Sequence, residues 1–222
     1  MSSRVDADGD ALASYALTAN AGPLTACGWI YLNSLRGVTG FPIYFTDNGG
    51  TLMFGLMMTA ANVIQPINDA FSAGSSFSPS TGVWMHLAVT RDIDGVVSGY
   101  LNGVAFGSVA ITNTGKVAFL FIGGNTSTSW VDADFAYWRV WQRTLNSTQI
   151  DNESRSPVAL ERTGLYADWP MLSGSRTTDL SGMGHGVSEE GAIGDGGAFV
   201  IAPATTARAD RSIERRMKSG AI

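Results

Sequence analysis

Short apolar segments separated by turn residues run through the first 145 residues, and no helical periodicity is sustained among them. Clusters typical of tight turns stand between these segments: "DNGG" at 47–50, "DG" at 94–95 and "NG" at 102–103. Such clusters favour hairpins, because glycine and asparagine accept the positive φ angles that match the twist of paired strands. Strands at this spacing predict an all-β fold, a two-sheet antiparallel β-sandwich.

The remaining segments fit the same architecture. Pro66, inside "VIQPI", marks an edge strand or a bulge because proline has no N–H to donate. Asn146 or Ser147 can cap one short helix that carries Gln149 and Ile150 toward the core. Beyond residue 160 the pattern loosens: "GLYADWPML" and "AFVIAP" are strand candidates, joined by a glycine-rich connection.

The composition is consistent with one well-packed domain. Hydrophobic residues make up 45% of the chain and charged residues only 15%, whereas a disordered chain is poor in apolar residues and rich in charge. We assign residues 1–200 to a single sandwich, closed by strands within 160–202. Residues 203–222 form a C-terminal extension, and we expect it to behave as a basic arm.

Charge separates this arm from the rest of the chain. The net charge is −5, yet residues 205–222 hold five basic side chains against two acidic ones, leaving nine basic and seventeen acidic residues elsewhere. Basic charges interrupted by acidic ones make a weak nucleic-acid contact. A solvated end and an anchor to a partner remain open, and the anchoring candidates are Arg208, Arg211, Arg215, Arg216 and Lys218.

Several classes of protein are disfavoured by what the sequence lacks. A single cysteine, Cys27, allows no internal disulfide framework and no paired-cysteine metal site. The start, "MSSRVDADGD", has no signal-peptide apolar region, and no apolar run reaches membrane-spanning length. We therefore expect a chain made in a cytoplasm, without a signal peptide and without a membrane partner.

Five motifs in order resemble the concanavalin A-like jelly roll, in particular its laminin-G-like and pentraxin-like group. They are "CGWIYLN", "GVWMHLAVTRD", "GYLNGVAFGS", "FIGGN" and "ADFAYWRVWQRTLNSTQI", and the resemblance spans residues 1–155. A later phrase, "YADWPMLSGSRTTDLSGMGHG", resembles a segment that commonly starts such modules. Here it follows the main body, so we predict that it supplies a closing strand of the jelly roll.

His86 lies near two carboxylates, Asp92 and Asp94, and invites a catalytic interpretation. In a strand, however, Trp84 and His86 share one face, so the imidazole lies beside a ring on the surface of a sheet. The resemblance also implies a structural role for this histidine. We favour the structural interpretation.

A glycosidase is disfavoured by the distribution of acidic residues. Cleavage of a glycosidic bond requires two carboxyl groups about 5 to 10 Å apart, and this chain has no glutamate before Glu153. The nearest pair, Asp132 and Asp134, lies in a segment that better resembles a non-catalytic laminin-G-like strand. We predict that the protein is not an enzyme.

Calcium is a candidate cofactor. The segment "DADGD" places Asp6, Asp8 and Asp10 at the spacing of a calcium loop, and Ca²⁺ prefers oxygen ligands of this kind. The closing glutamate of a complete calcium loop is missing. A polar hairpin before the first strand is the competing interpretation.

Loops rich in small polar residues are candidates for binding a ligand. Trp130 lies in one such loop, after Asn125, and an exposed indole can stack against a sugar. Asp47 and Asn48 occupy another. The alternative for Trp130 is that it caps the core of the sandwich.

Laminin-G-like modules of this build resemble virion proteins of bacterial viruses. The resemblance implies a non-catalytic display or adhesion module, a phage-type structural or decoration protein in the virion that can bind surface glycans. Its partners would be a capsid, a tail or further copies of itself, held through the arm. The competing expectation is a bacterial glycan-binding lectin with no virion.

Overall fold

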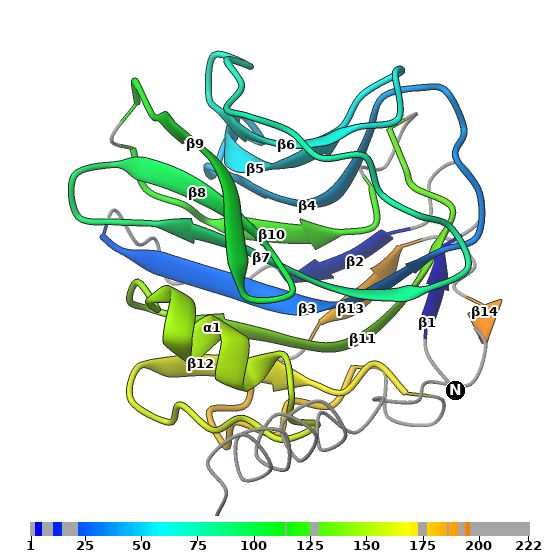
Figure 1. Cartoon of the computed structure of the whole chain (residues 1–222). Helices are drawn as coiled ribbons and strands as arrows, with labels where there is room; N and C mark the ends of the chain where they lie inside the picture. Colours follow the sequence, from blue (N-terminus) through cyan, green and yellow to red (C-terminus); the bar gives the residue numbers. More distant parts are fainter. Residues whose placement is uncertain are drawn as a thin grey trace, which may run out of the picture.

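The computed structural model describes residues 3–5, 11–14, 22–113, 115–124, 129–172, 177–185, 187–190 and 194–195. These residues form two antiparallel sheets packed face to face (Figure 1). The predicted all-β sandwich is therefore confirmed. Among the described residues no helix is long and apolar enough to span a bilayer.

The first sheet follows the order β14-β1-β11-β3-β7-β8-β9, and β12 also pairs with β11. Its strands are β1 (Ser3–Val5), β3 (Leu24–Leu32), β7 (Trp84–Arg91), β8 (Val96–Leu101), β9 (Val104–Ala110), β11 (Ala133–Trp141), β12 (Leu165–Trp169) and β14 (Gly194–Asp195).

The second sheet follows the order β13-β2-β10-β4-β5-β6. Its strands are β2 (Ala11–Ser14), β4 (Gly40–Thr46), β5 (Leu52–Met58), β6 (Ile64–Asn68), β10 (Phe119–Ile122) and β13 (Ser188–Glu190). The strand that contains Pro66 lies at the edge of this sheet, as expected for a residue with no N–H.

The core lies between the two sheets and follows the alternation of side chains along each strand. In β3, Ala26 and Ile30 point into the main cluster, whereas Cys27 belongs to a smaller cluster beneath the helix. Gly28 faces the core as well, and a Cβ atom there would lie 2.4 Å from the Trp138 ring. The close approach of this indole to β3 therefore requires glycine.

Three hairpin turns share one device, a side-chain oxygen that accepts N–H groups two and four residues ahead. Asp47 Oδ1 accepts from Gly49 and Thr51, and Asn68 and Asp92 do the same in their own turns. Positive φ values at Gly50, Gly95 and Gly103 complete the turns at 47–50, 94–95 and 102–103. The hairpins predicted from sequence are confirmed.

The helix α1 (Ser147–Glu153) covers part of the outer face of the first sheet (Figure 1). Asn146 is its N-cap: its side chain accepts from Gln149 N–H at 2.9 Å, and Gln149 Oε1 accepts from the Asn146 N–H at 3.1 Å. Ile150 is fully buried, as predicted. Gln149 instead closes the capping box, because its amide is used at the helix start.

The segment after the helix completes the first sheet. Residues 165–169 form β12 on β11, so the strand predicted in "GLYADWPML" is present, whereas the other strand candidate, "AFVIAP", lies outside the described residues. The glycine-rich stretch was expected to be an irregular connection, yet it contributes the short strands β13 and β14. β13 pairs with β2, and β14 pairs with β1. The two segments have no alternation of apolar and polar residues that would predict a strand from sequence.

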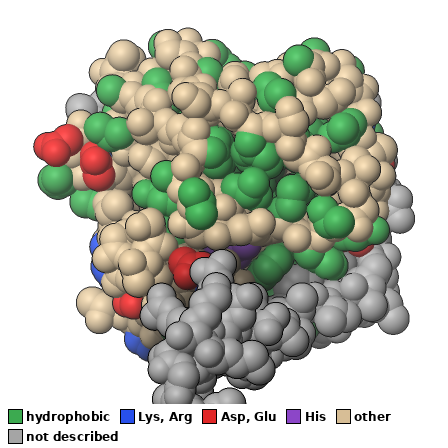
Figure 2. Space-filling model, viewed as in Figure 1, with side chains coloured by type: hydrophobic (Ala, Val, Ile, Leu, Met, Phe, Trp, Pro, Cys, Tyr) green, Lys and Arg blue, Asp and Glu red, His purple; other side chains and the backbone are tan. Residues whose placement is uncertain are grey.

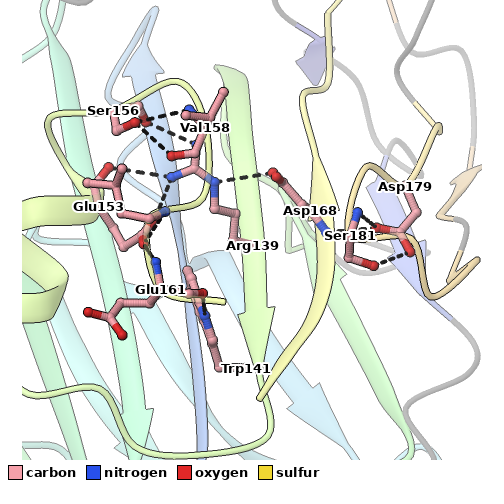
Figure 3. Close-up of polar contacts among 10 residues, drawn as sticks. Arg139, Trp141, Glu153, Ser156, Val158, Glu161, Asp168, Asp179 and Ser181 are labelled. Carbon is pink, nitrogen blue, oxygen red and sulfur yellow. Dashed lines mark hydrogen bonds and ion pairs between the residues drawn. The ribbon is translucent and has the colours of Figure 1, made fainter. Parts of the chain in front are cut away.

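A buried ion network joins the helix, β11 and β12. Arg139 Nη1 donates to Glu153 Oε2 at 2.7 Å, Nε donates to Asp168 Oδ1 at 3.2 Å, and Nη2 donates to the Ser156 carbonyl at 3.0 Å (Figure 3). Glu153 Oε1 accepts the N–H groups of Leu160 and Glu161 at 2.8 and 2.6 Å. The network fixes the chain between α1 and β12 onto the sheet.

Candidate functional site

A pocket of about 390 Å³ lies in the second sheet, and its residues come from β4, β5, β10 and the turns after β4 and β6. This volume lies within the range of small-ligand pockets. The lining residues are Phe41, Tyr44, Thr46, Gly50, Thr51, Leu52, Asp69, Phe71 and Phe121.

Three aromatic rings pack against one another in this pocket. Phe121 and Tyr44 are register partners on β10 and β4, and their rings stack with centroids 4.9 Å apart at 10°. Phe41 packs against Tyr44 at 5.1 Å and 48°. The three side chains belong to an apolar cluster separate from the main core, since they lie on the outer face of the sheet.

The neighbouring strand has no side chain next to Tyr44. Gly55 is the register partner of Tyr44 on β5. A Cβ atom on Gly55 would lie 2.5 Å from the Ile43 carbonyl oxygen and 2.7 Å from Tyr44 Cα. Any larger residue would push the two strands apart, so the position of Tyr44 depends on this glycine.

Two polar side chains lie among these rings. Thr46 is 2% exposed, and its buried Oγ1 has no hydrogen-bond partner. Asp69 accepts from the Thr112 N–H at 2.8 Å through Oδ1 and from the Thr112 hydroxyl at 2.5 Å through Oδ2. A buried hydroxyl without a partner is costly, so a ligand that reaches Thr46 would recover a hydrogen bond.

The turn that contains the predicted ligand-binding residues Asp47 and Asn48 lies beside this pocket. Thr46, Gly50 and Thr51 line the pocket and flank Asp47 and Asn48 in the sequence. The Asp47 carboxylate is used within its own turn, and Asn48 is exposed. The structure thus brings the Asp47 turn to the pocket, but neither of the two predicted side chains lines it.

Trp130 lies at the opposite end of β4. Its carbonyl oxygen lies against Gly40, the first residue of β4, whereas Thr46 is the last, which places the two ends roughly 20 Å apart. The Arg36 guanidinium covers the Trp130 ring at 3.5 Å, and the half-buried indole packs against the main core. This placement favours the core-capping alternative, and ligand binding by Trp130 stays a prediction.

The other predicted site residues fall outside the described residues. They are Asn125, the calcium candidates Asp6, Asp8 and Asp10, and the arm residues Arg208, Arg211, Arg215, Arg216 and Lys218. Within the described ranges, no group of three or more His, Cys, Asp or Glu side chains is arranged to hold a metal ion.

Asp132 and Asp134, around the start of β11, bind the two residues that follow β3. Asp132 Oδ2 accepts from the Ser34 hydroxyl at 2.6 Å, and Asp134 Oδ1 accepts from the Asn33 amide at 3.3 Å. Asp134 is only 3% exposed. These contacts are those of a structural pair.

His86 lies on the outer face of the first sheet, because its neighbours Met85 and Leu87 point into the main core. Its ring packs edge-on against Trp29 at 5.5 Å, and its Nδ1 is buried without a partner. Burial and, to a smaller extent, the positive charge of Arg139 lower the pKa of His86 to about 3. A neutral imidazole in this position supports the structural interpretation.

Other aromatic residues share this outer face. Tyr31 and Trp84 pack at 5.5 Å from adjacent strands, and hydrophobic side chains gather in the middle of the face beside α1 (Figure 2). Cys27 is buried beneath the helix, and desolvation raises the pKa of its thiol. Such a thiol is unreactive, because the thiolate is the nucleophilic form.

Two antiparallel sheets packed face to face, with one short helix on an outer face, form a jelly-roll sandwich. Residues 6–151 match the laminin-G-like family described as the concanavalin A-like lectin/glucanases superfamily, and the chain belongs to this family. The family resemblance seen in the sequence is thereby confirmed. A search of curated proteins gives no match.

Solved structures show the same fold at low sequence identity. A heptameric SAP-like pentraxin from Limulus polyphemus is 14% identical with a TM-score of 0.65, over 90% of this chain and 97% of that one. A candidate carbohydrate-binding protein from Bacteroides ovatus is 13% identical with a TM-score of 0.64, over 90% and 62%. A Trypanosoma rangeli sialidase is 19% identical with a TM-score of 0.50, over 59% and only 22%.

Proposed function

We propose that this protein is a non-catalytic carbohydrate-binding module, and that the pocket of Tyr44, Phe121 and Asp69 is its binding site. The observation that carries the proposal is the combination of stacked rings with a buried, unpartnered Thr46 hydroxyl in one pocket. The name of the Bacteroides ovatus neighbour, a candidate carbohydrate-binding protein, points the same way.

The chemistry of the pocket suits a sugar. The C–H face of a pyranose packs against aromatic rings, while its hydroxyls need a few fixed polar partners. Thr46 offers a hydroxyl that can both donate and accept, and Asp69 offers a carboxylate that accepts. The nine lining residues thus combine apolar and polar contacts within one small volume.

Binding without cleavage is favoured by the number of carboxyl groups. Most glycosidases act with two carboxylates on either side of the scissile bond. The residues that line this pocket include one, Asp69. We therefore retain a non-catalytic role in the proposal.

The expected result for Thr46→Val is a three- to tenfold loss of affinity for bound glycans, because one hydrogen bond to the ligand is lost. Valine has nearly the same shape, and no protein partner of the hydroxyl is left behind, so the fold should be retained. A glycan array selects the ligand, and isothermal titration calorimetry measures the affinity. Circular dichroism verifies folding.

Two tyrosines give a matched pair for the same experiment. Tyr44→Ala removes a ring of the pocket and should weaken binding at least tenfold. Tyr31→Ala removes a ring from the outer face of the other sheet and should leave affinity unchanged. Equal affinity of Thr46→Val, Tyr44→Ala and the unmodified protein would rule out this pocket as the glycan site.

We also propose the finer role of display on a virion of the phage type, with the basic arm 203–222 as the anchor. Supporting it are the family resemblance and the contrast in charge between the arm and the acidic remainder of the chain. The competing role is a free bacterial lectin with the same pocket.

Deletion of residues 203–222 should leave a folded body that no longer associates with particles. The measurement is cosedimentation of the full and shortened chains with purified virus particles in a density gradient, with detection by mass spectrometry. Absence of the full chain from the particles, or equal association of both chains, would contradict the anchoring role.

A further inference from the structure

We infer that the pocket selects positively charged amino sugars over acidic sugars, because the charged side chain among its lining residues is the carboxylate of Asp69. The inference rests on the proposed glycan-binding function and specifies its ligand class. It concerns the described pocket residues alone.

The charge of the pocket has one sign. Of the nine lining residues only Asp69 carries a formal charge, and none is lysine or arginine. Seventeen acidic and nine basic residues outside segment 205–222 add an acidic background. A field of this sign attracts cations and repels anions before any contact is made.

Asp69 is held in its ionised form. Burial alone would raise its pKa, but hydrogen bonds from the Thr112 hydroxyl and from nearby backbone N–H groups outweigh burial, and the pKa is lowered. The two Thr112 contacts use one position on each oxygen. The Asp69 side chain is partly exposed, so a ligand ammonium can approach the carboxylate and form a charge-assisted hydrogen bond with it.

The aromatic rings add to the same preference. A cation over the face of a ring is attracted by the negative charge of the π system. Tyr44 and Phe121 are stacked in the pocket, and Phe71 beside them is 57% exposed. An amino sugar can therefore bring its ammonium to Asp69 while its ring packs on the aromatic residues.

An acidic sugar meets the opposite situation. Its carboxylate would enter a pocket with a fixed like charge and no cationic side chain among the lining residues. Specificity then arises from repulsion of the wrong ligand as well as attraction of the right one. The affinity for neutral sugars should lie between the affinities for amino sugars and for acidic sugars.

The test is calorimetric titration with three oligosaccharides of equal length: glucosamine oligomers, their fully N-acetylated counterparts and oligogalacturonates. At about pH 6 the sugar amine is protonated, because amines of this type titrate above that value. We expect glucosamine oligomers to bind about five- to tenfold more tightly than the N-acetylated ones, and oligogalacturonates not to bind.

Asp69→Asn should remove this preference while keeping an oxygen that accepts from Thr112. Asp92→Asn is the matched control: it makes the same change of charge in a turn between β7 and β8 of the other sheet. It should leave the preference intact. Raising the salt concentration should reduce the preference as well, because exposed charges are screened.

The outcomes separate the two proposals. If N-acetylated oligomers bind through Tyr44 and Thr46 but amino sugars gain nothing, the charge inference is wrong and the glycan function stands. If the preference survives in Asp69→Asn, Asp69 is not its source and the inference is overturned. If no oligosaccharide binds, the inference and the glycan function fall together.

Discussion

Replacing Arg139 with methionine should lower the free energy of unfolding by about 3–5 kcal/mol. The guanidinium is 1% exposed and neutralises two carboxylates, Glu153 and Asp168, which are 0% and 5% exposed. Its removal would leave both charges buried without a cation, in a region where solvent cannot compensate them. Urea denaturation at pH 7, followed by tryptophan fluorescence, measures the change.

An exposed ion pair provides the control. Arg155 pairs with Asp151 at 2.6 Å, but the two side chains are 49% and 36% exposed. Arg155→Met should change stability by about 0.5 kcal/mol or less, because surface pairs are screened. A loss below about 1 kcal/mol for Arg139→Met would contradict a structural role of the buried network.

The second large effect is acid destabilisation through His86. Its pKa is about 3 in the folded protein against 6.5 ordinarily, because burial disfavours the charged ring. The neutral form therefore stabilises the fold above pH 6.5, and this contribution is lost as the pH falls from 6.5 toward 3. Between pH 7.5 and pH 5 the expected loss is about 2 kcal/mol.

His86→Leu isolates this contribution. It removes a titrating ring whose buried Nδ1 has no partner, so no hydrogen bond to that atom is lost. A second variant, His185→Gln, leaves His86 as the sole imidazole. Between pH 7.5 and pH 5, the free energy of unfolding of His185→Gln should fall by about 2 kcal/mol more than that of His86→Leu. Parallel pH profiles would show that His86 is not responsible.

Local sequence patterns predicted most of the fold. The turns at Asp47 and Asp92 form because a side-chain oxygen and a following glycine favour a turn whatever surrounds them. The turn at Asn102 and Gly103 relies on positive φ angles instead, and the Asn102 side-chain oxygen accepts the His86 N–H 16 residues away. The Asn146 cap is local in the same way. The strands β13 and β14 were missed, because they form only by pairing with β2 and β1.

The pocket could not be predicted in the same way. In "FPIYF" all five residues are apolar, so the sequence does not tell which rings face the core and which face outward. A register shift between Gly40 and Ile43 allows Phe41 and Tyr44, three residues apart, to face outward together. The polar turn at Asp47 and Asn48 is recognisable in the sequence, whereas no local pattern points to Tyr44, Phe121 and Asp69.

The sequence by itself therefore determined a two-sheet jelly roll, its hairpins, its helix cap and its family, because turn chemistry and alternation act over a few residues. The tertiary structure alone decided where polar and aromatic side chains meet. Asp69 and Thr46 come from different strand ends of one sheet, and Arg139 meets carboxylates 14 and 29 residues away. Such meetings depend on strand register, which pairing and packing across the whole sandwich fix together.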